Sequence, residues 1–308
     1  MNNFIFQNST KVYFGKGCVK EYLACLTKDA RTILLAYGGG SIKRNGVYDE
    51  ITGILKEAGK VIVEFSGIMP NPTYAKVKEG AKLARDYPAL NPRFALMDPI
   101  YTFSVPEKQM VSGSFDILSH IMETYFSEPN EDNVSDDIME ALMKNVIRNL
   151  RAAIQNPQDY TARSNLMWDA TMAENRVIKM GKKCDFQCHN MEHQLGAYTD
   201  CNHGCGLAVI HPVYYRHIYR EGLPKFVRFA ENVWDIARDG KTDEELALAG
   251  IQALADFIKE IGLPATLREL GVDKAQLKEI ADSCGISQGS YKLMTHEEIL
   301  EIFQECYE

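Results

Sequence analysis

The chain has 308 residues, of which 45% are hydrophobic and 25% charged, as in an ordinary globular protein with one large or two medium domains. A net charge of −8 without any block of basic residues argues against nucleic-acid binding. No apolar run approaches the roughly 18 residues of a membrane span, and the N-terminus lacks the pattern of a signal peptide, so we expect a cytoplasmic protein.

The first third of the chain alternates between short apolar segments and amphipathic ones. Strands are expected at Lys11–Phe14 and in the segment before it, at Thr32–Tyr37, Val61–Phe65 and Phe94–Met97, with helices at Val47–Lys56 and Tyr74–Arg85. This alternation predicts an α/β domain with a parallel sheet. The sheet is small, since its three main strands, which begin at Thr32, Val61 and Phe94, are about half of the six in a full dinucleotide-binding sheet.

The pattern changes after Asp98 and Pro99, and no convincing strand follows from residue 110 to the end. Periodic apolar positions predict helices near 111–126, 134–153, 160–179, 185–197, 204–219, 224–237, 243–260, 274–282 and 296–306. We therefore predict two domains, an α/β domain over residues 1–99 and an all-helical domain over residues 100–308.

Candidate metal ligands lie in the helical part. Asp116 and His120 are four residues apart on a predicted helix, which places both on one face. His189 and His193 repeat this spacing, and His203 follows at the start of the next predicted helix. Imidazole nitrogens with one carboxylate suit Fe²⁺ or Zn²⁺ rather than Ca²⁺ or Mg²⁺. Spacing alone leaves such a site and a set of unrelated polar residues about equally supported.

Four of the eight cysteines offer a competing site. Cys184, Cys188, Cys201 and Cys205 have the count of a four-thiolate zinc site. Their pairs have three intervening residues on predicted helices, whereas structural zinc sites favour tighter pairs. A thiolate site would also leave the histidines unexplained, so these cysteines are otherwise read as reduced, small core residues.

The sequence resembles a known family at these residues. Asp116-x3-His120 followed by His189-x3-His193-x9-His203 is similar to the motifs of the iron-containing alcohol dehydrogenases, closest to the butanol dehydrogenase branch. The resemblance extends through most of residues 4–86 and 90–308 and implies a Rossmann-like domain followed by a helical bundle. It implies that Asp116, His120, His189 and His203 bind Fe²⁺ or Zn²⁺. It further implies that His193 is a catalytic residue beside the substrate and nicotinamide, and that the protein is a homodimer acting on a small primary alcohol or aldehyde.

The resemblance also assigns residues to the cofactor, NAD or NADP. Gly38, Gly39, Gly40 and Ser41 follow the second strand and look like the family's first nucleotide loop, and Asn71 looks like a residue that closes over the cofactor. Glycines after a strand let backbone N–H groups approach a phosphate or ribose, although a simple tight turn has the same sequence. The absence of an acidic residue directly after the strand slightly favours NADPH.

One departure from the family pattern is large. In the family, roughly 80 residues separate the helix that here ends near Asp86 from the strand at Phe94–Met97, judged from the usual length of such chains. That segment carries a second glycine loop for the pyrophosphate and a stretch beside the nicotinamide. Without it, the dehydrogenase activity is expected to be impaired. The alternative is a metal-binding paralogue or subunit of the same fold that is not a dehydrogenase.

Overall fold

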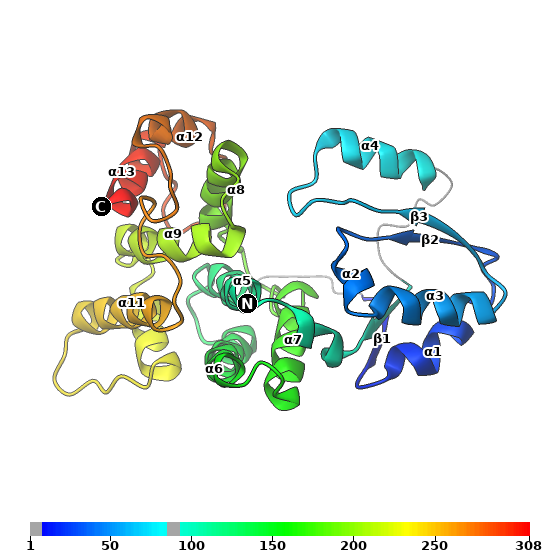
Figure 1. The fold of residues 1–308 in the computed structure, drawn as a ribbon. Coiled ribbons are helices and arrows are strands. Elements are labelled where there is room, and N and C mark those ends of the chain that lie inside the picture. Colours follow the sequence, from blue (N-terminus) through cyan, green and yellow to red (C-terminus); the bar gives the residue numbers. More distant parts are fainter. Residues whose placement is uncertain (1–7, 85–92) are drawn as a thin grey trace. The chain divides into compact units, whose positions relative to one another are not determined.

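The structure is a computed structural model that describes residues 8–84 and 93–308. The chain divides into two compact units, one ending at Val105 and one running from Pro106 to Glu308 (Figure 1). The strand expected before Lys11 and the junction expected between Asp86 and Phe94 fall largely on residues 1–7 and 85–92, outside the described residues. No helix of the described chain is both long and apolar enough to cross a membrane.

The N-terminal unit alternates strands and helices, as predicted. Its elements are β1 (Lys11–Phe14), α1 (Cys18–Leu26), β2 (Thr32–Ala36), α2 (Ser41–Arg44), α3 (Val47–Glu57), β3 (Val61–Phe65), α4 (Tyr74–Leu83), β4 (Phe94–Met97) and a 3₁₀ helix, η1 (Pro99–Ser104). The sequence prediction missed α1 and the short α2. Both begin after a glycine, Gly17 and Gly40, without a side chain that caps the helix, so the usual start signal is absent.

The prediction of parallel strands is confirmed, but the prediction of one sheet is wrong for the described residues. β1 pairs with β4 in register Lys11 to Phe94, and β2 pairs with β3 in register Thr32 to Val61. Each pair is a separate two-stranded sheet within the described chain. A physical reason is the segment that the resemblance marks as missing, because a strand from it would be needed to continue a sheet between the two pairs.

The second unit is helical, which confirms the prediction. Its α-helices are α5 (Glu107–Tyr125), α6 (Val134–Gln155), α7 (Tyr160–Glu174), α8 (Gln187–Thr199), α9 (His203–Ile218), α10 (Leu223–Arg228), α11 (Asp243–Glu260), α12 (Leu277–Ser283) and α13 (His296–Tyr307), with a π-helical turn η2 (Phe229–Val233) and a 3₁₀ turn η3 (Lys274–Gln276). The helix predicted over 224–237 is wrong in its second half, because α10 passes into η2 and Asp235 takes a positive φ of 55°. The helix predicted over 160–179 ends at Glu174, and Arg176 has a φ of 72°.

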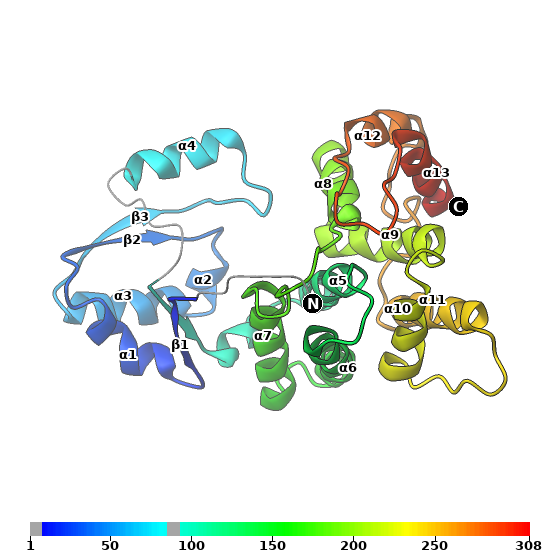
Figure 2. The same cartoon turned by 180° about the vertical axis from the view of Figure 1, so that it is seen from behind.

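Helix α5 forms the centre of this unit. It packs against α6, α7 and α9, while α8 packs against α9 and α12 (Figures 1 and 2). The side chains of Phe115 and Ile121 on α5 are completely buried. Helices α5 and α9 approach so closely that a Cβ at Gly204 would lie 2.1 Å from the carbonyl oxygen of Ser112. A glycine is therefore required at the start of α9, next to His203.

Candidate metal centre

Three histidines converge on one carboxylate in the helical unit. Oδ1 of Asp116 lies 3.5 Å from Nε2 of His120, 3.5 Å from Nε2 of His189 and 3.5 Å from Nε2 of His203. Helix α5 supplies Asp116 and His120 one turn apart, α8 supplies His189 in its first turn, and α9 supplies His203 as its first residue. The four residues predicted as ligands are thus brought together at the meeting point of three helices.

Two of these atoms lack a conventional partner. Oδ1 of Asp116 and Nε2 of His189 are buried, and neither has a hydrogen-bond partner among the described residues. Burying a polar atom without a partner costs free energy, so buried polar groups normally bind a hydrogen-bonding group or a metal. Ligand atoms of Asp116, His120 and His189 all lie within 4.8 Å of one another. The donor set and its orphaned atoms therefore fit one divalent ion.

His203 belongs to two groups of possible ligands. It lies within 4.8 Å of ligand atoms of Glu192 and His193, and its Nε2 also faces Asp116. Its Nδ1 atom makes a short hydrogen bond with Oε2 of Glu192. Because Glu192 occupies Nδ1, the nitrogen left for a metal ion is Nε2, which points to Asp116. We therefore assign His203 to the group around Asp116.

Each of the three histidines has a carboxylate at its other nitrogen. Nδ1 of His189 makes a short hydrogen bond with Oε2 of Glu123, and Nδ1 of His120 lies 2.7 Å from Oε1 of Glu174. The hydrogen bonds from Glu123 and Glu192 fix the rings of His189 and His203 with Nε2 toward Asp116, whereas His120 and Glu174 are related by an ion-pair distance. Such carboxylate–histidine pairs are the usual second layer of a metal site.

Sequence reasoning missed these carboxylates. Glu123 follows His120 by three residues, and Glu192 follows His189 by three, so helical spacing was an available signal. The spacing did not reveal that Glu123 forms a hydrogen bond with His189 and Glu192 with His203, because each pair consists of residues from two different helices. Glu123 and Glu192 are almost completely buried, with exposures of 0% and 2%. A carboxylate so buried requires partners, which the imidazole rings provide.

The neighbouring charges shift the pKa values of Asp116, His189 and His203. Burial would raise the pKa of Asp116, but contacts with His189 and His203 hold it well below its usual range. Burial likewise opposes protonation of the two rings, yet the neighbouring carboxylates raise the pKa of His189 to about 9 and that of His203 to about 10. A metal ion must therefore displace protons from these rings when it binds.

His193 lies beside the group on the exposed side of α8. Its ring stacks on His203, with centroids 5.5 Å apart and planes 20° from parallel, and lies 5.8 Å from the ring of His189. Partial burial lowers the pKa of His193, and the positive charges of His189 and His203 lower it further. The ring is therefore neutral near pH 7 and can accept a proton.

The competing thiolate site is not formed among the described residues. The groups of possible ligands found there contain no cysteine, and all eight cysteines are free. Cys188 is completely buried, which raises the pKa of its thiol well above the usual value and disfavours the thiolate that metal binding requires. The complete burial of Cys188 supports the interpretation that it is a small residue of the hydrophobic core.

The predicted cofactor residues of the N-terminal unit lie in two loops that contact each other. Gly38, Gly39, Gly40 and Ser41 follow β2, and Asn71 lies in the loop between β3 and α4. The two loops are joined, because Gly67 N donates to the Gly38 carbonyl oxygen at 2.9 Å. A Cβ at Gly38 would lie 3.2 Å from the carbonyl oxygen of Ile68, so the close approach favours glycine.

Comparison with known proteins identifies the family. The family model described as "Fe-containing alcohol dehydrogenase family, C-terminal" matches residues 110–307, and "Iron-containing alcohol dehydrogenase" matches residues 9–99. The chain is 31% identical to NADH-dependent butanol dehydrogenase A of Clostridium acetobutylicum, in an alignment that covers 100% of each. The chain belongs to the iron-containing alcohol dehydrogenase family. Its place in the butanol dehydrogenase-like branch, expected from the motifs, is confirmed.

Solved structures of this family have the same fold. The NADH-dependent butanol dehydrogenase A of Thermotoga maritima matches with a TM-score of 0.93 at 28% identity, covering 100% of this chain and 99% of that one. The aldehyde reductase YqhD of Escherichia coli matches with a TM-score of 0.88 at 25% identity, covering 99% and 100%. The expected architecture, an α/β unit followed by a helical unit, is therefore confirmed.

This family member is shorter than its relative. The alignment with the Clostridium acetobutylicum enzyme extends over 390 positions, whereas the chain has 308 residues. The relative thus has residues without a counterpart here, in agreement with the expected internal gap. The division of the N-terminal strands into two separate pairs agrees with a gap in that unit.

Proposed function

We propose that this chain is a metal-dependent, NAD(P)-linked alcohol dehydrogenase or aldehyde reductase that acts on a small primary alcohol or its aldehyde. The observation that carries the proposal is the equal 3.5 Å separation of Asp116 Oδ1 from three imidazole Nε2 atoms. Relatives named as butanol dehydrogenases and as an NADPH-dependent aldehyde reductase support the class of substrate.

In this proposal Asp116, His120, His189 and His203 hold one Fe²⁺ or Zn²⁺ ion. The ion supplies Lewis acidity toward an alcohol or carbonyl oxygen. The ligand types accept both metals, and the family description favours iron. Glu123, Glu174 and Glu192 orient the rings so that their Nε2 atoms are available to the ion.

His193 is the proposed proton acceptor. It is exposed, it lies against the rings of His189 and His203, and its lowered pKa keeps it neutral. A neutral imidazole can take the proton that an alcohol loses and pass it to water, and the protonated ring returns it during aldehyde reduction. The nicotinamide carries the hydride, and the protein only positions it.

Gly38, Gly39, Gly40, Ser41 and Asn71 are proposed to contact the adenosine side of NAD or NADP. Backbone N–H groups of a glycine loop can approach a phosphate or ribose. The family's second glycine loop, which holds the pyrophosphate, has no counterpart in this sequence. We therefore expect the cofactor to bind more weakly than in a full-length relative.

The divided sheet and the shorter chain favour a second candidate function, a metal-binding protein of this fold without dehydrogenase activity. Titration of NADH and NADPH into the metal-loaded protein, followed by nicotinamide fluorescence, separates the two. Saturable binding together with butanol- or butanal-dependent turnover supports the dehydrogenase. Metal binding without cofactor binding at millimolar concentrations supports the second candidate.

A further inference from the structure

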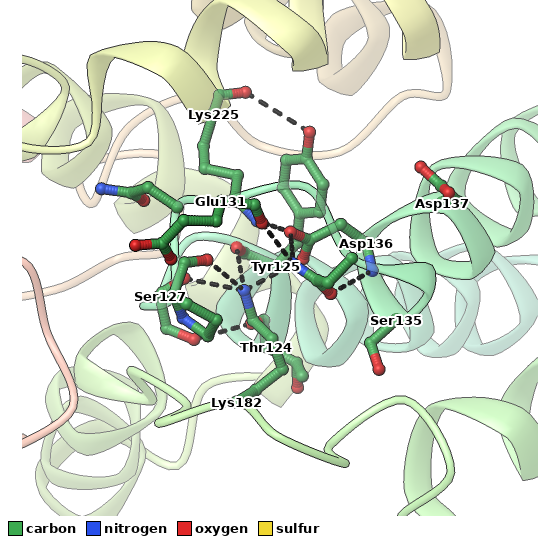
Figure 3. Close-up of polar contacts among 12 residues, drawn as sticks. Thr124, Tyr125, Ser127, Glu131, Ser135, Asp136, Asp137, Lys182 and Lys225 are labelled. Carbon is green, nitrogen blue, oxygen red and sulfur yellow. Dashed lines mark hydrogen bonds and ion pairs between the residues drawn. The ribbon is translucent and has the colours of Figure 1, made fainter. Parts of the chain in front are cut away.

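A buried lysine outside the metal centre connects two segments of the chain that carry proposed metal ligands. The side chain of Lys182 is 0% exposed and contacts the 1% exposed carboxylate of Asp136 (Figure 3). Its Nζ donates to Oδ1 of Asp136 at 2.9 Å and to the carbonyl oxygen of Ser127 at 2.7 Å, with longer contacts of 3.4 Å to the carbonyl oxygens of Tyr125 and Pro129. An ammonium group fully removed from water requires such a set of partners.

These carbonyl groups belong to the C-terminal end of α5 and the turn after it. Helix α5 ends at Tyr125, and the last carbonyls of a helix have no partner within it. They also form the negative end of the helix dipole, which a cation stabilises. Lys182 therefore fixes the end of the helix that carries Asp116, His120 and Glu123.

The residues after Lys182 continue this attachment toward α8. Lys183 N donates to the carbonyl oxygen of Glu128, Cys184 N to Oγ of Ser127, and Asp185 N to the carbonyl oxygen of Glu123. Helix α8 then begins, and Cys188 N donates to Oε1 of Glu123 at 2.6 Å. The segment that starts at Lys182 thus runs along the end of α5 and places His189 next to Glu123.

A second buried lysine contacts the same carboxylate but lacks these connections. Lys225 of α10 forms a short ion pair with Oδ2 of Asp136, and its Nζ lies 4.9 Å from the ring centroid of Tyr125. Within the described residues, no hydrogen bond from its Nζ to a carbonyl of α5 is found. Figure 3 shows both lysines reaching Asp136 from opposite sides. Lys225 is therefore a matched comparison for Lys182, with the same residue type, similar side-chain burial and the same counter-ion.

We propose that Lys182 is a positioning residue of the metal centre. It ties the C-terminal end of α5 to the segment that leads into α8, and so sets His189 against Glu123 and Asp116. This inference rests on the ligand set in the proposed function. Nothing in it requires Lys182 to touch the metal ion or the substrate.

The test compares Lys182→Met with Lys225→Met in the full chain, using Co²⁺ as a spectroscopic probe of the site. Lys182→Met should weaken Co²⁺ binding about 10–100-fold, the loss typical of an orienting partner of a metal ligand, and should shift the visible Co²⁺ absorption. Lys225→Met should keep the wild-type affinity and spectrum. Circular dichroism of the chelated proteins establishes that each variant is folded.

Two results overturn the inference. One is an unchanged affinity and spectrum in Lys182→Met, and the other is an equal loss in both lysine variants, which would mean that the ion cluster only stabilises the fold. If Lys182→Met does not fold, Ser127→Ala decides, because it removes the acceptor of Cys184 N, by which the segment after Lys182 is attached to the turn after α5, together with a donor to the carbonyl oxygen of Thr124. A smaller loss of affinity is expected, and wild-type binding would overturn the inference. Failure of the wild-type protein to bind Co²⁺ would instead contradict the proposed function itself.

Discussion

His203, the first residue of α9, directs Nε2 to within 3.5 Å of Oδ1 of Asp116 in the middle of α5. The contact is possible because Gly204 lets α9 approach the backbone of Ser112. Glu192 holds the other nitrogen of the ring. One close helix crossing and one buried carboxylate therefore place the ligand that is most distant in sequence from Asp116.

The first prediction concerns the ligands. His189→Ala and His203→Ala should each abolish stoichiometric metal binding, because each removes one of the four atoms proposed to bind the ion. Elemental analysis after dialysis measures this directly. Cys188→Ala is the control, since its thiol is buried and protonated, and it should retain full metal. Full metal in both histidine variants, with loss in the cysteine variant, would show that the ligand set is wrong.

The second prediction concerns the carboxylate behind His203. A Cβ at Gly206 would lie 2.8 Å from Cγ and 2.9 Å from Oε1 of Glu192, so Gly206→Ala should push this side chain away from His203. We expect metal affinity to fall about 10–100-fold, as for other losses of an orienting partner. Isothermal titration with Zn²⁺ measures the effect.

Gly113→Ala on α5 is the matched control for this substitution, because no atom lies within 4 Å of the added Cβ. It should leave the affinity unchanged and stabilise the helix by up to about 1 kcal/mol. An unchanged affinity in Gly206→Ala would mean that Glu192 does not orient His203.

The third prediction concerns His193 and the pH dependence of turnover. Alcohol oxidation requires a neutral ring that can accept a proton, so kcat/KM should fall as the pH drops through the pKa of His193, which lies below the usual 6.5. In His193→Gln this inflection should disappear, and the rate should decrease about 10²–10⁴-fold. Metal content should stay at the wild-type level. A preserved inflection would assign the proton transfer to another group.

The fourth prediction links Asp185 to stability. The side chain is buried, and burial together with the charge of Glu123 raises its pKa from the usual 3.8 to about 7. A raised folded-state pKa means that its contribution to stability is fully present below about pH 4 and is lost as the pH rises through about 7.

Asp185→Asn removes this titration. The free energy of unfolding of the variant should therefore increase relative to that of wild type between pH 5 and pH 8, as measured by urea denaturation. The amide keeps only one of the two oxygens that accept hydrogen bonds from Ser290 and Tyr214. The loss of the other acceptor lowers the stability of the variant at both pH values and does not alter this trend. A constant difference across the pH range would contradict the raised pKa.

Much of the fold could be predicted because its signals are local. The apolar periodicity that predicts α5, α6 and α11 is a property of neighbouring residues, and so are the capping residues at Asn133 and Thr242. The elements without such signals, α1 and α2, were missed. The division of the strands into two pairs could not be predicted from any one strand, because pairing depends on which other strands are present.

The sequence by itself determined the helical character of residues after about 110, and the spacing of Asp116, His120, His189 and His203 that led to the family. Only the tertiary structure decided that one oxygen of Asp116 faces three Nε2 atoms, and that Glu123, Glu174 and Glu192 stand behind the rings. The physical reason is that the sequence alone specifies the residue type of each ligand and its spacing along a helix. Its direction depends on how α5, α8 and α9 pack, and on buried partners such as Lys182 that lie far from it in the chain.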